Sequence, residues 1–241
     1  MDVKGIVLAG GTGSRLMPLT KVTNKHLLPV GQKPMIFYPI EKFTSVGIEE
    51  IMIVTGLEHM GDVVNLLGSG KDFGCRFTYK VQDQAGGIAQ ALALAENFSS
   101  NKSLAVILGD NIFKASLKSY IDKFVAQGDG ARILLKEVQF PQRFGVAELS
   151  DGKVIGIVEK PENPKSNYAV TGIYFYDAAV FDIIRTLKPS ARGELEITHV
   201  NDTYINQGRL EYDILDGWWT DAGTFESLGT ANELVANDPP Q

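Results

Sequence analysis

A glycine-rich segment near the start of the chain could hold a phosphate group. It reads Leu-Ala-Gly-Gly-Thr-Gly-Ser-Arg over residues 8–15 and continues a short apolar run that is typical of a buried strand. Glycine adopts positive φ angles and carries no Cβ, so consecutive backbone N–H groups can turn toward an anion or the edge of a base. Arg15 adds a fixed positive charge where the glycines end. The segment predicts a binding loop for a flat polyanion, and an ordinary turn with a surface arginine is an equal alternative.

The spacing of these residues differs from that of two familiar phosphate-binding loops. A P-loop requires Gly-Lys followed by Ser or Thr, and the dinucleotide-binding fingerprint requires a third glycine where this chain has Arg15. Lys25 follows in a polar stretch that ends at Pro29 and could reach the same phosphates. Taken alone, Lys25 would more readily be a solvated surface lysine.

A second glycine-containing turn spans residues 82–87, between a predicted strand and a predicted helix. Gln82 offers an amide donor and an amide acceptor, which suit the adjacent N–H and C=O groups of a thymine or uracil edge. Considered in isolation, the segment is explained more simply as turn glycines beside a surface amide.

Two aspartates far apart in the sequence are candidate ligands of a metal ion. Asp110 lies just beyond the apolar run 104–108, and Asp221 follows two tryptophans. Mg²⁺ is usually held by one or two carboxylates together with substrate phosphates. Asp221 could instead cap the helix predicted from residue 224, and Asp110 could be a turn residue, although this alternative is weaker for Asp110.

Acidic and basic residues also occur together at Glu159-Lys160 and in the segment 189–196, which contains Arg192. Glu159 could accept hydrogen bonds from sugar hydroxyl groups while Lys160 holds a phosphate. Surface ion pairing is the plain alternative for both segments.

The composition limits the classes of partner. The chain has 241 residues, 44% of them hydrophobic, which is enough for a sizeable core. Its formal net charge of −6 argues against nucleic acid or an anionic membrane as a partner, so local cations must form any phosphate site. The single cysteine, Cys75, excludes an intrachain disulfide, and the three histidines lack metal-ligand spacing. With no leader and no apolar run long enough for a bilayer, we expect a cytoplasmic protein.

The elements that must position these residues alternate between strand and helix over the first half of the chain. We expect strands at 6–9, 50–55, 75–81 and 104–108, and helices at 34–43, 60–67 and 88–95. This alternation is typical of a parallel sheet covered by helices on both faces, in which ligands bind beyond the C-terminal ends of the strands. The glycine loop, Gln82 and Asp110 are therefore expected on one rim.

From about Ala131 the pattern changes to consecutive strands, and we expect a mixed sheet whose second half faces the substrate. The predicted strands are 132–138, 145–149, 154–159 and 169–176, with a hairpin turn at 150–152. Helices return at 178–187, 197–207 and 224–235.

Taken together, the motifs resemble those of the sugar nucleotidyltransferases, in the order found in that family. They are Leu-Ala-Gly-Gly-x-Gly-x-Arg-Leu, Lys-x-Leu-Leu-Pro-Val, the turn after Gln82, Leu-Gly-Asp-Asn, Arg-Phe-Gly-Val, Glu-Lys-Pro, Tyr-Ala-Val-Thr-Gly-Ile-Tyr-Phe-Tyr-Asp and Arg-Gly-Glu-Leu-Glu-Ile-Thr. The resemblance covers residues 4 to about 232 and is nearest to members that transfer a thymidylyl group from dTTP to glucose 1-phosphate.

The resemblance implies a Rossmann-like α/β fold and a role for each matching residue. It implies one nucleotidyltransferase domain over 1–241, with a nucleotide-binding half at 1–130 and a sugar-phosphate-binding half at 131–241. The implied catalytic residues are Arg15, Lys25, Asp110 and Lys160, and Asp110 and Asp221 would hold Mg²⁺. The implied nucleotide-binding residues are Leu8, Gly10, Gly11, Thr12, Gly13, Gln82 and Gly87. The implied sugar-phosphate-binding residues are Asn111, Gly145, Glu159, Lys160, Val170 and Arg192.

The implied reaction gives dTDP-glucose and pyrophosphate, as a first step toward dTDP-rhamnose and related deoxysugars. A phosphate oxygen of glucose 1-phosphate attacks the α-phosphorus of dTTP in line. This nucleophile is already ionised at neutral pH, so no general base is required. We expect no nucleic-acid or membrane partner, and a homo-oligomer.

The chain departs from the family pattern at three places. Ala85 stands where many relatives have proline, and His199 stands where an aspartate is usual. The chain also ends soon after the predicted 224–235 helix, whereas longer members carry a further helical segment tied to feedback control, so we expect a short form in which that control is in doubt.

Three other functions are alternatives. They are a uridylyltransferase or cytidylyltransferase on another sugar phosphate, a non-catalytic nucleotide-sugar sensor, and a dinucleotide-binding dehydrogenase. Gln82 disfavours cytosine, whose N3 is an acceptor, and Arg15 disfavours the dehydrogenase. The presence of all the implied charged residues argues against a sensor.

Overall fold

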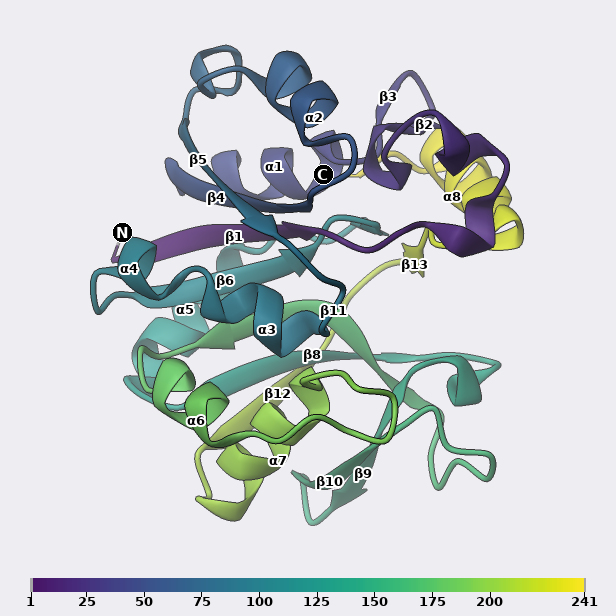
Figure 1. Ribbon diagram of the computed structural model, residues 1–241. Coiled ribbons are helices and arrows are strands. Elements are labelled where there is room, and N and C mark those ends of the chain that lie inside the picture. The colour runs from purple at the N-terminus through teal and green to yellow at the C-terminus, as the bar shows by residue number, and fades with distance from the viewer. Residues whose placement is uncertain (1, 241) are drawn as a thin grey trace.

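A mixed sheet runs through the molecule (Figure 1). The computed structural model describes residues 2–240, and within them nine strands form this sheet. At its centre β1 (Val3–Ala9) lies between β4 (Glu50–Gly56) and β6 (Ser103–Leu108), and β5 (Arg76–Gln82) continues the sheet beside β4. All of these neighbours pair in parallel. The predicted parallel half is confirmed.

The second half of the chain extends the same sheet. β11 (Tyr168–Tyr176) is antiparallel to β6 and to β8 (Ala131–Glu137), and β12 (Leu210–Ile214) pairs in parallel with β8. β9 (Gly145–Ser150) and β10 (Lys153–Glu159) form an antiparallel hairpin that joins β11 at its start. The mixed, mostly parallel sheet that was expected is confirmed.

Helices cover both faces of the sheet, because β1 sends alternate side chains to opposite sides. On one face Val7 packs among α1 (Phe37–Thr44), α2 (Met60–Leu67) and α5 (Lys118–Gln127). On the other face Ile6 and Leu8 pack among α3 (Ile88–Ala93), α6 (Val180–Thr186) and α7 (Ile197–Asn206). Figure 1 shows the second group in front of the sheet and α1 and α5 behind it.

A third core lies at the C-terminal end of β1, beside the predicted rim. It joins the short pair β2 (Pro29–Val30) and β3 (Lys33–Pro34) to α8 (Phe225–Asn237). Beside it, β7 (Asn111–Phe113) pairs with β13 (Trp219–Asp221). Thr224 and Ser227 cap α8 reciprocally. Asp221 is therefore not the cap of this helix, and that alternative was wrong.

Several element boundaries differ from the sequence predictions. α1 starts at Phe37 rather than Pro34, because Lys33–Pro34 pairs with Pro29–Val30. The helix predicted at 88–95 ends at Ala93, and a separate turn of helix, α4 (Glu96–Ser99), follows. β2, β3, α5, β7, β12 and β13 were not predicted. The turn at 150–152 is confirmed, since Asp151 and Gly152 both have positive φ angles, of 50° and 73°.

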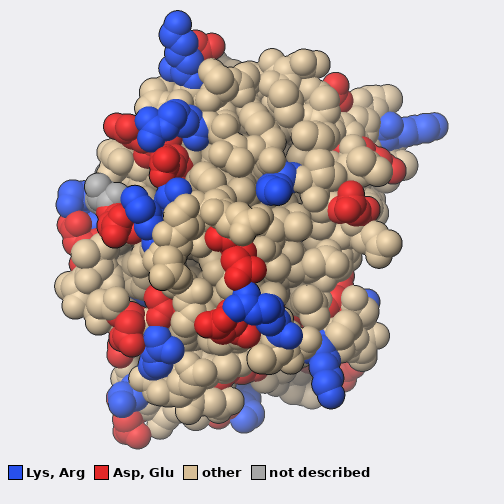
Figure 2. All heavy atoms as spheres, turned by 60° about the vertical axis from the view of Figure 1, so that its left-hand side comes forward, with Lys and Arg blue, Asp and Glu red and all other residues tan. Residues whose placement is uncertain are grey.

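Charged side chains of both signs are mixed on the face shown in Figure 2, in agreement with the modest net charge. Among residues 2–240 no helix combines the length and the apolar character that crossing a bilayer requires.

Candidate active site

One cleft opens at the rim where the parallel strands end, and most of the predicted site residues line it. Of the residues to which the resemblance gives a role, all except Thr12, Gly13 and Arg192 lie on its wall. They come from segments between Leu8 and Asp221, so the fold brings together groups that are far apart in the sequence. The location agrees with the rule that ligands bind beyond the C-terminal ends of parallel strands.

The glycine loop forms the part of the wall that follows β1. Gly11 and Gly13 have φ angles of 90° and 62°, which side chains rarely allow. A Cβ at Gly13 would lie 2.7 Å from Cγ2 of Thr20, whereas a Cβ at Gly11 would meet nothing within 4 Å. Space above Gly11 is therefore open to a ligand. Buried Leu16 anchors the turn that follows and leaves Arg15 exposed at the cleft.

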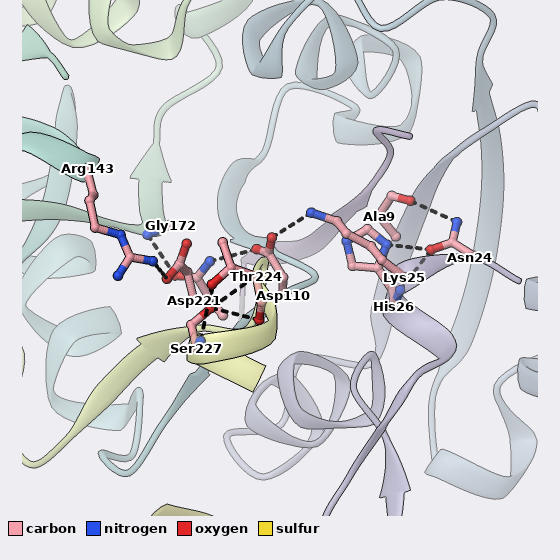
Figure 3. A network of polar contacts seen from close by, with 11 residues as sticks. Ala9, Asn24, Lys25, His26, Asp110, Arg143, Gly172, Asp221, Thr224 and Ser227 are labelled. Atoms are coloured by element: carbon pink, nitrogen blue, oxygen red, sulfur yellow. Dashed lines mark hydrogen bonds and ion pairs between the residues drawn. The ribbon is translucent and has the colours of Figure 1, made fainter. Parts of the chain in front are cut away.

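Asp110 and Asp221 lie side by side because β7 pairs with β13. This pairing places Asp221 opposite Asn111, and the backbone N–H of Ala222 donates to the carbonyl of Asp110 at 2.8 Å. Figure 3 shows the two carboxylates with Lys25 on one side and Arg143 on the other. Lys25 Nζ lies 2.6 Å from Asp110 Oδ2, and Arg143 Nη2 lies 3.9 Å from Asp221 Oδ1.

The environments of the two carboxylates shift their pKa values in opposite directions. Burial by itself would raise the pKa of Asp110, but the charge and hydrogen bond of Lys25, with help from Asn111, hold the pKa well below its usual range. Burial, followed by the charge of Asp110, raises the pKa of Asp221 to about 6, and Arg143, Arg15 and Lys25 oppose this rise. The nearby cations thus do not fully offset burial and the negative charge of Asp110 at the Asp221 carboxylate.

The donor set of this pair suits a divalent cation. A Cβ built on Gly223 would lie 3.4 Å from Asp110 Oδ2, 3.6 Å from Asp221 Oδ2 and 3.1 Å from Arg15 Nη2. One point is therefore within reach of both carboxylates, and the glycine keeps that point free of side-chain atoms. Hard cations such as Mg²⁺ take carboxylate oxygens of this kind, completed by water and substrate oxygens. The residues present fit the predicted metal.

Gln82 presents an acceptor rather than both of its polar groups. Its Nε2 donates to the carbonyl of Gly87 at 3.1 Å and to Gln90 Oε1 at 2.8 Å. Gln90 Oε1 in turn accepts from the N–H of Gly86 at 3.1 Å, so fixed backbone groups determine both amide orientations. Gln82 Oε1 and the N–H of Gly87 have no hydrogen-bond partner within residues 2–240. The hydrogen-bond donor available to a base is therefore the Gly87 N–H. The Gln82 Nε2 group already donates to Gly87 and Gln90.

Asn111 ties the carboxylate pair to the sheet. Its Oδ1 accepts from the N–H of Gly172 at 2.9 Å and from Trp219 Nε1 at 2.7 Å, and its Nδ2 donates to Asp110 Oδ1 at 3.0 Å. A Cβ at Gly172 would lie 2.6 Å from Asn111 Nδ2, which explains the glycine at that point of β11. Three of the hydrogen bonds that Asn111 can make are thus used within the protein and orient Asp110, and its expected contact with the sugar phosphate stays a prediction.

The far wall of the cleft carries the candidate sugar-binding groups. Glu159 ends β10, and its Oε2 accepts a hydrogen bond from Thr198 Oγ1 at 3.2 Å. A Cβ at Gly145 would lie 3.3 Å from the same oxygen, so this glycine leaves room above Glu159. Lys160 has a φ of 45°, a left-handed conformation unusual for lysine, and its N–H donates to the carbonyl of Phe144 at 3.0 Å.

Arg192 lies beside the cleft and is held by carboxylates. Its Nε and Nη2 donate to the two oxygens of Glu196 at 3.1 and 2.8 Å, and Glu159 and Glu194 lie 3.5 and 3.8 Å from Nη2. The neighbouring carboxylates raise the pKa of this guanidinium against the opposing effect of burial, which is the largest single cause. A sugar phosphate would have to exchange with some of these contacts.

His26 is a cleft residue that the sequence did not assign to the site. Its Nδ1 lies 2.7 Å from Asn24 Oδ1, and its backbone N–H donates to the same oxygen at 2.9 Å. Burial and then the charge of Lys25 lower the pKa of His26 to about 3, so the ring is neutral at physiological pH. The neutral His26 ring therefore contributes an uncharged surface to the cleft next to Lys25.

Other cleft residues were also missed, and they share weak sequence signals. They are Arg143, Phe144, Tyr174, Thr198, Asn201 and Trp219. Several lie within motifs that carry the resemblance, such as Arg-Phe-Gly-Val, but nothing in the motif alone shows which side chain faces the cleft. For Tyr174 and Trp219 the strand register decides which face the side chain takes, and for Arg143, Thr198 and Asn201 the packing of a turn and of α7 decides it.

The sequence model described as "Nucleotidyl transferase" matches residues 4–238 of this chain, and the chain belongs to that family. Among curated relatives, the glucose-1-phosphate thymidylyltransferase of Neisseria meningitidis is 44% identical over 97% of this chain and 82% of its own length.

Solved structures agree with this assignment. A Bacillus anthracis protein, described as a candidate glucose-1-phosphate thymidylyltransferase in complex with sucrose, has a TM-score of 0.94 and 59% identity over 98% of this chain and 96% of its own. A UDP-glucose pyrophosphorylase with bound UDP-glucose has a TM-score of 0.84 and 28% identity over 98% of this chain and 99% of its own.

Proposed function

We propose that this protein transfers a thymidylyl group from dTTP to glucose 1-phosphate and releases pyrophosphate. The observation that carries the proposal is the convergence of Asp110 and Asp221 with Arg15, Lys25 and Arg143 at one rim of the sheet. The relatives named above, at 44% and 59% identity, support this choice of substrates.

The geometry of Gln82 and Gly87 supports a thymine or uracil base. The free Gln82 Oε1 can accept from the base N3–H, and the free Gly87 N–H can donate to a neighbouring carbonyl oxygen. Cytosine presents an acceptor at N3 and would face the Gln82 oxygen without a hydrogen bond. A base bound in this way would leave the ribose and phosphates to extend along the cleft, whose wall includes Gly10, Gly11 and Arg15.

The cations of the cleft meet the main demand of the reaction, which is to bring two anions together. Two unit charges about 4 Å apart repel by roughly 4 kcal/mol at an effective dielectric constant near 20. Lys160 and Arg192 would hold the attacking phosphate, and Lys25 would contact the nucleotide phosphates. Arg15 would meet the charge that develops on the leaving pyrophosphate.

Asp110 and Asp221 would hold Mg²⁺, and this ion would neutralise charge on the α-phosphate. Arg143, which lines the cleft 3.9 Å from Asp221, would add a further positive charge near the transferred group. The remaining expectations stay predictions: one domain with halves at 1–130 and 131–241, a homo-oligomer, and a cytoplasmic location.

Pyrophosphate release tests the proposal directly. The purified chain with dTTP, glucose 1-phosphate and Mg²⁺ is expected to release pyrophosphate continuously, and omission of any one component should abolish it. Release from dTTP without glucose 1-phosphate would indicate a hydrolase, and no release under any condition would contradict the proposal. The variant Asp110→Asn should be inactive while it remains folded, as judged by its circular dichroism.

The UDP-glucose pyrophosphorylase at 28% identity supports uridylyl transfer as a second candidate. Thymine and uracil differ by one methyl group, and such a difference is worth about 1–3 kcal/mol, or roughly 10–200-fold. We therefore expect UTP to be a poorer substrate that is still accepted. Competition between dTTP and UTP decides the case, and equal specificity constants would overturn the thymidylyl assignment without affecting the fold.

A further inference from the structure

Asn201 holds a buried amide group that the protein leaves half satisfied. It lies on α7 with no exposed surface, and its Oδ1 accepts a hydrogen bond from the hydroxyl of Tyr176 at 2.7 Å. Its Nδ2 is the one buried side-chain nitrogen or oxygen within residues 2–240 that has no hydrogen-bond partner. Nearly all such groups are paired in folded proteins, so this exception requires an explanation.

The exception does not depend on which way the amide is turned. A tyrosine hydroxyl can both donate and accept, so Tyr176 could pair with either the oxygen or the nitrogen of Asn201. Whichever atom faces Tyr176, the other polar atom of the amide stays buried and unpaired. A leucine of similar size would fill the same space without an unpaired amide, although the Tyr176 hydroxyl would then lose its partner.

Asn201 belongs to the wall of the cleft, on the sugar side. Thr198 precedes it by one turn of α7, so both side chains lie on the same face of the helix, and Thr198 donates to Glu159 at 3.2 Å. Tyr174, which also lines the cleft, has a hydroxyl without a hydrogen-bond partner within the described residues. The Asn201 amide and the Tyr174 hydroxyl therefore both lie at the cleft without a hydrogen-bond partner within residues 2–240.

We propose that Asn201 is a specificity-determining residue for the sugar, and that its free amide group pairs with one oxygen at the floor of the sugar pocket. That oxygen is a hydroxyl of the hexose or a single water molecule that the bound hexose holds in place. The hydrogen bond from Tyr176 holds the Asn201 amide in position. Because the amide is buried, leaving its free polar atom without a hydrogen bond costs free energy, which favours a bound oxygen there. This inference rests on the proposed function, because it takes the ligand to be a hexose phosphate.

Kinetics with deoxy analogues of glucose 1-phosphate test the proposal. The wild type is expected to use one mono-deoxy analogue at least about 10-fold less well than glucose 1-phosphate in kcat/KM, and Asn201→Leu should remove most of this discrimination. The variant should also raise the KM for glucose 1-phosphate about 10-fold and leave the KM for dTTP unchanged. Unchanged discrimination in the variant would overturn the proposal.

Two further variants keep the test informative if Asn201→Leu folds poorly. Tyr176→Phe removes the partner of the amide oxygen but keeps the Asn201 amide, so it should lower the Tm and retain most of the sugar discrimination. The double variant Tyr176→Phe/Asn201→Leu leaves no unpaired polar atom at this position, so it should fold and lose the discrimination. Discrimination that persists in the folded double variant would also overturn the proposal.

The wild type in the same assay separates this inference from the proposed function. If the wild type releases no pyrophosphate from dTTP and glucose 1-phosphate, both the proposed function and the inference fail. If the wild type is active and the double variant discriminates as it does, the inference alone fails. A structure of the complex with the nucleotide-sugar product then shows whether a hydroxyl or a water lies beside Asn201.

Discussion

The Arg15 side chain should account for much of the catalytic rate, measured as kcat. Its guanidinium reaches the side of the carboxylate pair, since Nη2 lies 3.1 Å from the position that a Cβ on Gly223 would take. We expect Arg15→Ala to lower kcat by about 10³-fold, because cations of this kind stabilise charge in phosphoryl transfer by such factors. The measurement is kcat with both substrates saturating.

Lys21→Ala is the matched control for Arg15→Ala. Lys21 is an exposed cation on the next turn and does not line the cleft. Its replacement should change kcat by less than about twofold, as expected for a surface charge. A loss below tenfold for Arg15→Ala would show that Arg15 does not act in the transition state.

His26 should make the protein sensitive to mild acid. Burial, and then Lys25, lower its pKa to about 3 in the folded state, whereas an unfolded histidine has a pKa near 6.5. Between these values the unfolded chain binds a proton that the folded chain does not, so stability falls as the pH falls through this range. From pH 7 to pH 5 this one group should cost about 2 kcal/mol of unfolding free energy.

His26→Gln measures that contribution by difference. Urea unfolding at pH 7 and pH 5 should show the wild type losing about 2 kcal/mol more than the variant, since glutamine does not titrate. Parallel losses in the two proteins would mean that the histidine is protonated in the folded state or already shielded in the unfolded one.

At the scale of elements, the turn after β5 is joined by backbone hydrogen bonds to the segment that carries Arg192. The N–H of Leu195 donates to the carbonyl of Gly86 at 2.8 Å, and the carbonyl of Leu195 accepts from the N–H of Ala89 at 3.1 Å. Gly87 lies between them with a φ of 98°, and a Cβ there would lie 2.4 Å from the Leu195 carbonyl oxygen. A side chain at residue 87 must therefore push the two segments apart.

We expect Gly87→Ala to raise the KM for dTTP at least about 10-fold and to lower the unfolding free energy by roughly 2 kcal/mol or more, through strain and collision together. Gly128→Ala is the control, because Gly128 has a φ of 90° but nothing lies within 4 Å of its Cβ position. The control should lose stability through strain alone and keep its KM. Equal effects in the two variants would show that the contact with Leu195 is unimportant for the base pocket.

The elements show which parts of the structure the sequence could predict. Strands and helices with long apolar patterns, such as β4, α2 and β11, were predicted within about two residues. The short pairs β2 with β3 and β7 with β13 have too few residues for a periodic pattern, and only tertiary packing forms them. α5 was missed although its buried residues follow helical spacing, because its polar face is strong.

The same limit applies to the candidate site. Residues in the glycine loop and in Leu-Gly-Asp-Asn could be placed on the rim from strand order alone. The hydrogen bonds that occupy Gln82 Nε2, Asn111 and Arg192 could not, because only the folded structure brings their partners, on a turn, on β11 and just before α7, within reach. Arg143 and Asn201 were not assigned to the cleft either, because only the packing of a turn and of α7 against the sheet brings them there.

At the scale of the molecule, the cleft draws its wall from both halves of the chain, between Leu8 and Asp221. A ligand that binds only the folded state adds RT ln(1 + [L]/Kd) to the unfolding free energy. A ligand that contacts both halves makes more contacts and should have a lower Kd, so at equal concentration it should stabilise the fold more than a ligand that contacts one half. We expect dTDP-glucose to raise the Tm more than dTDP or glucose 1-phosphate at equal concentration. At about 100 times its Kd the product should add roughly 2.7 kcal/mol to the unfolding free energy.

Differential scanning fluorimetry measures these shifts. The variant Asp151→Ala, in the distant β9–β10 turn, should show the same ligand shifts as the wild type, whatever its own Tm. If dTDP alone stabilised as much as dTDP-glucose at the same concentration, the sugar wall would contribute nothing to affinity.

The locked amide of Gln82 has a consequence for redesign. The Gly87 carbonyl and, through Gln90, the Gly86 N–H determine which end of that side chain is free. If Gln82 contacts the base as proposed, the main chain of this turn would set the preference among pyrimidines. Replacing Gln82 alone would leave the Gly87 carbonyl, the Gly86 N–H and Gln90 in their present positions. An engineer who wants a cytidylyl donor would have to rebuild the whole bend from Gln82 to Gln90.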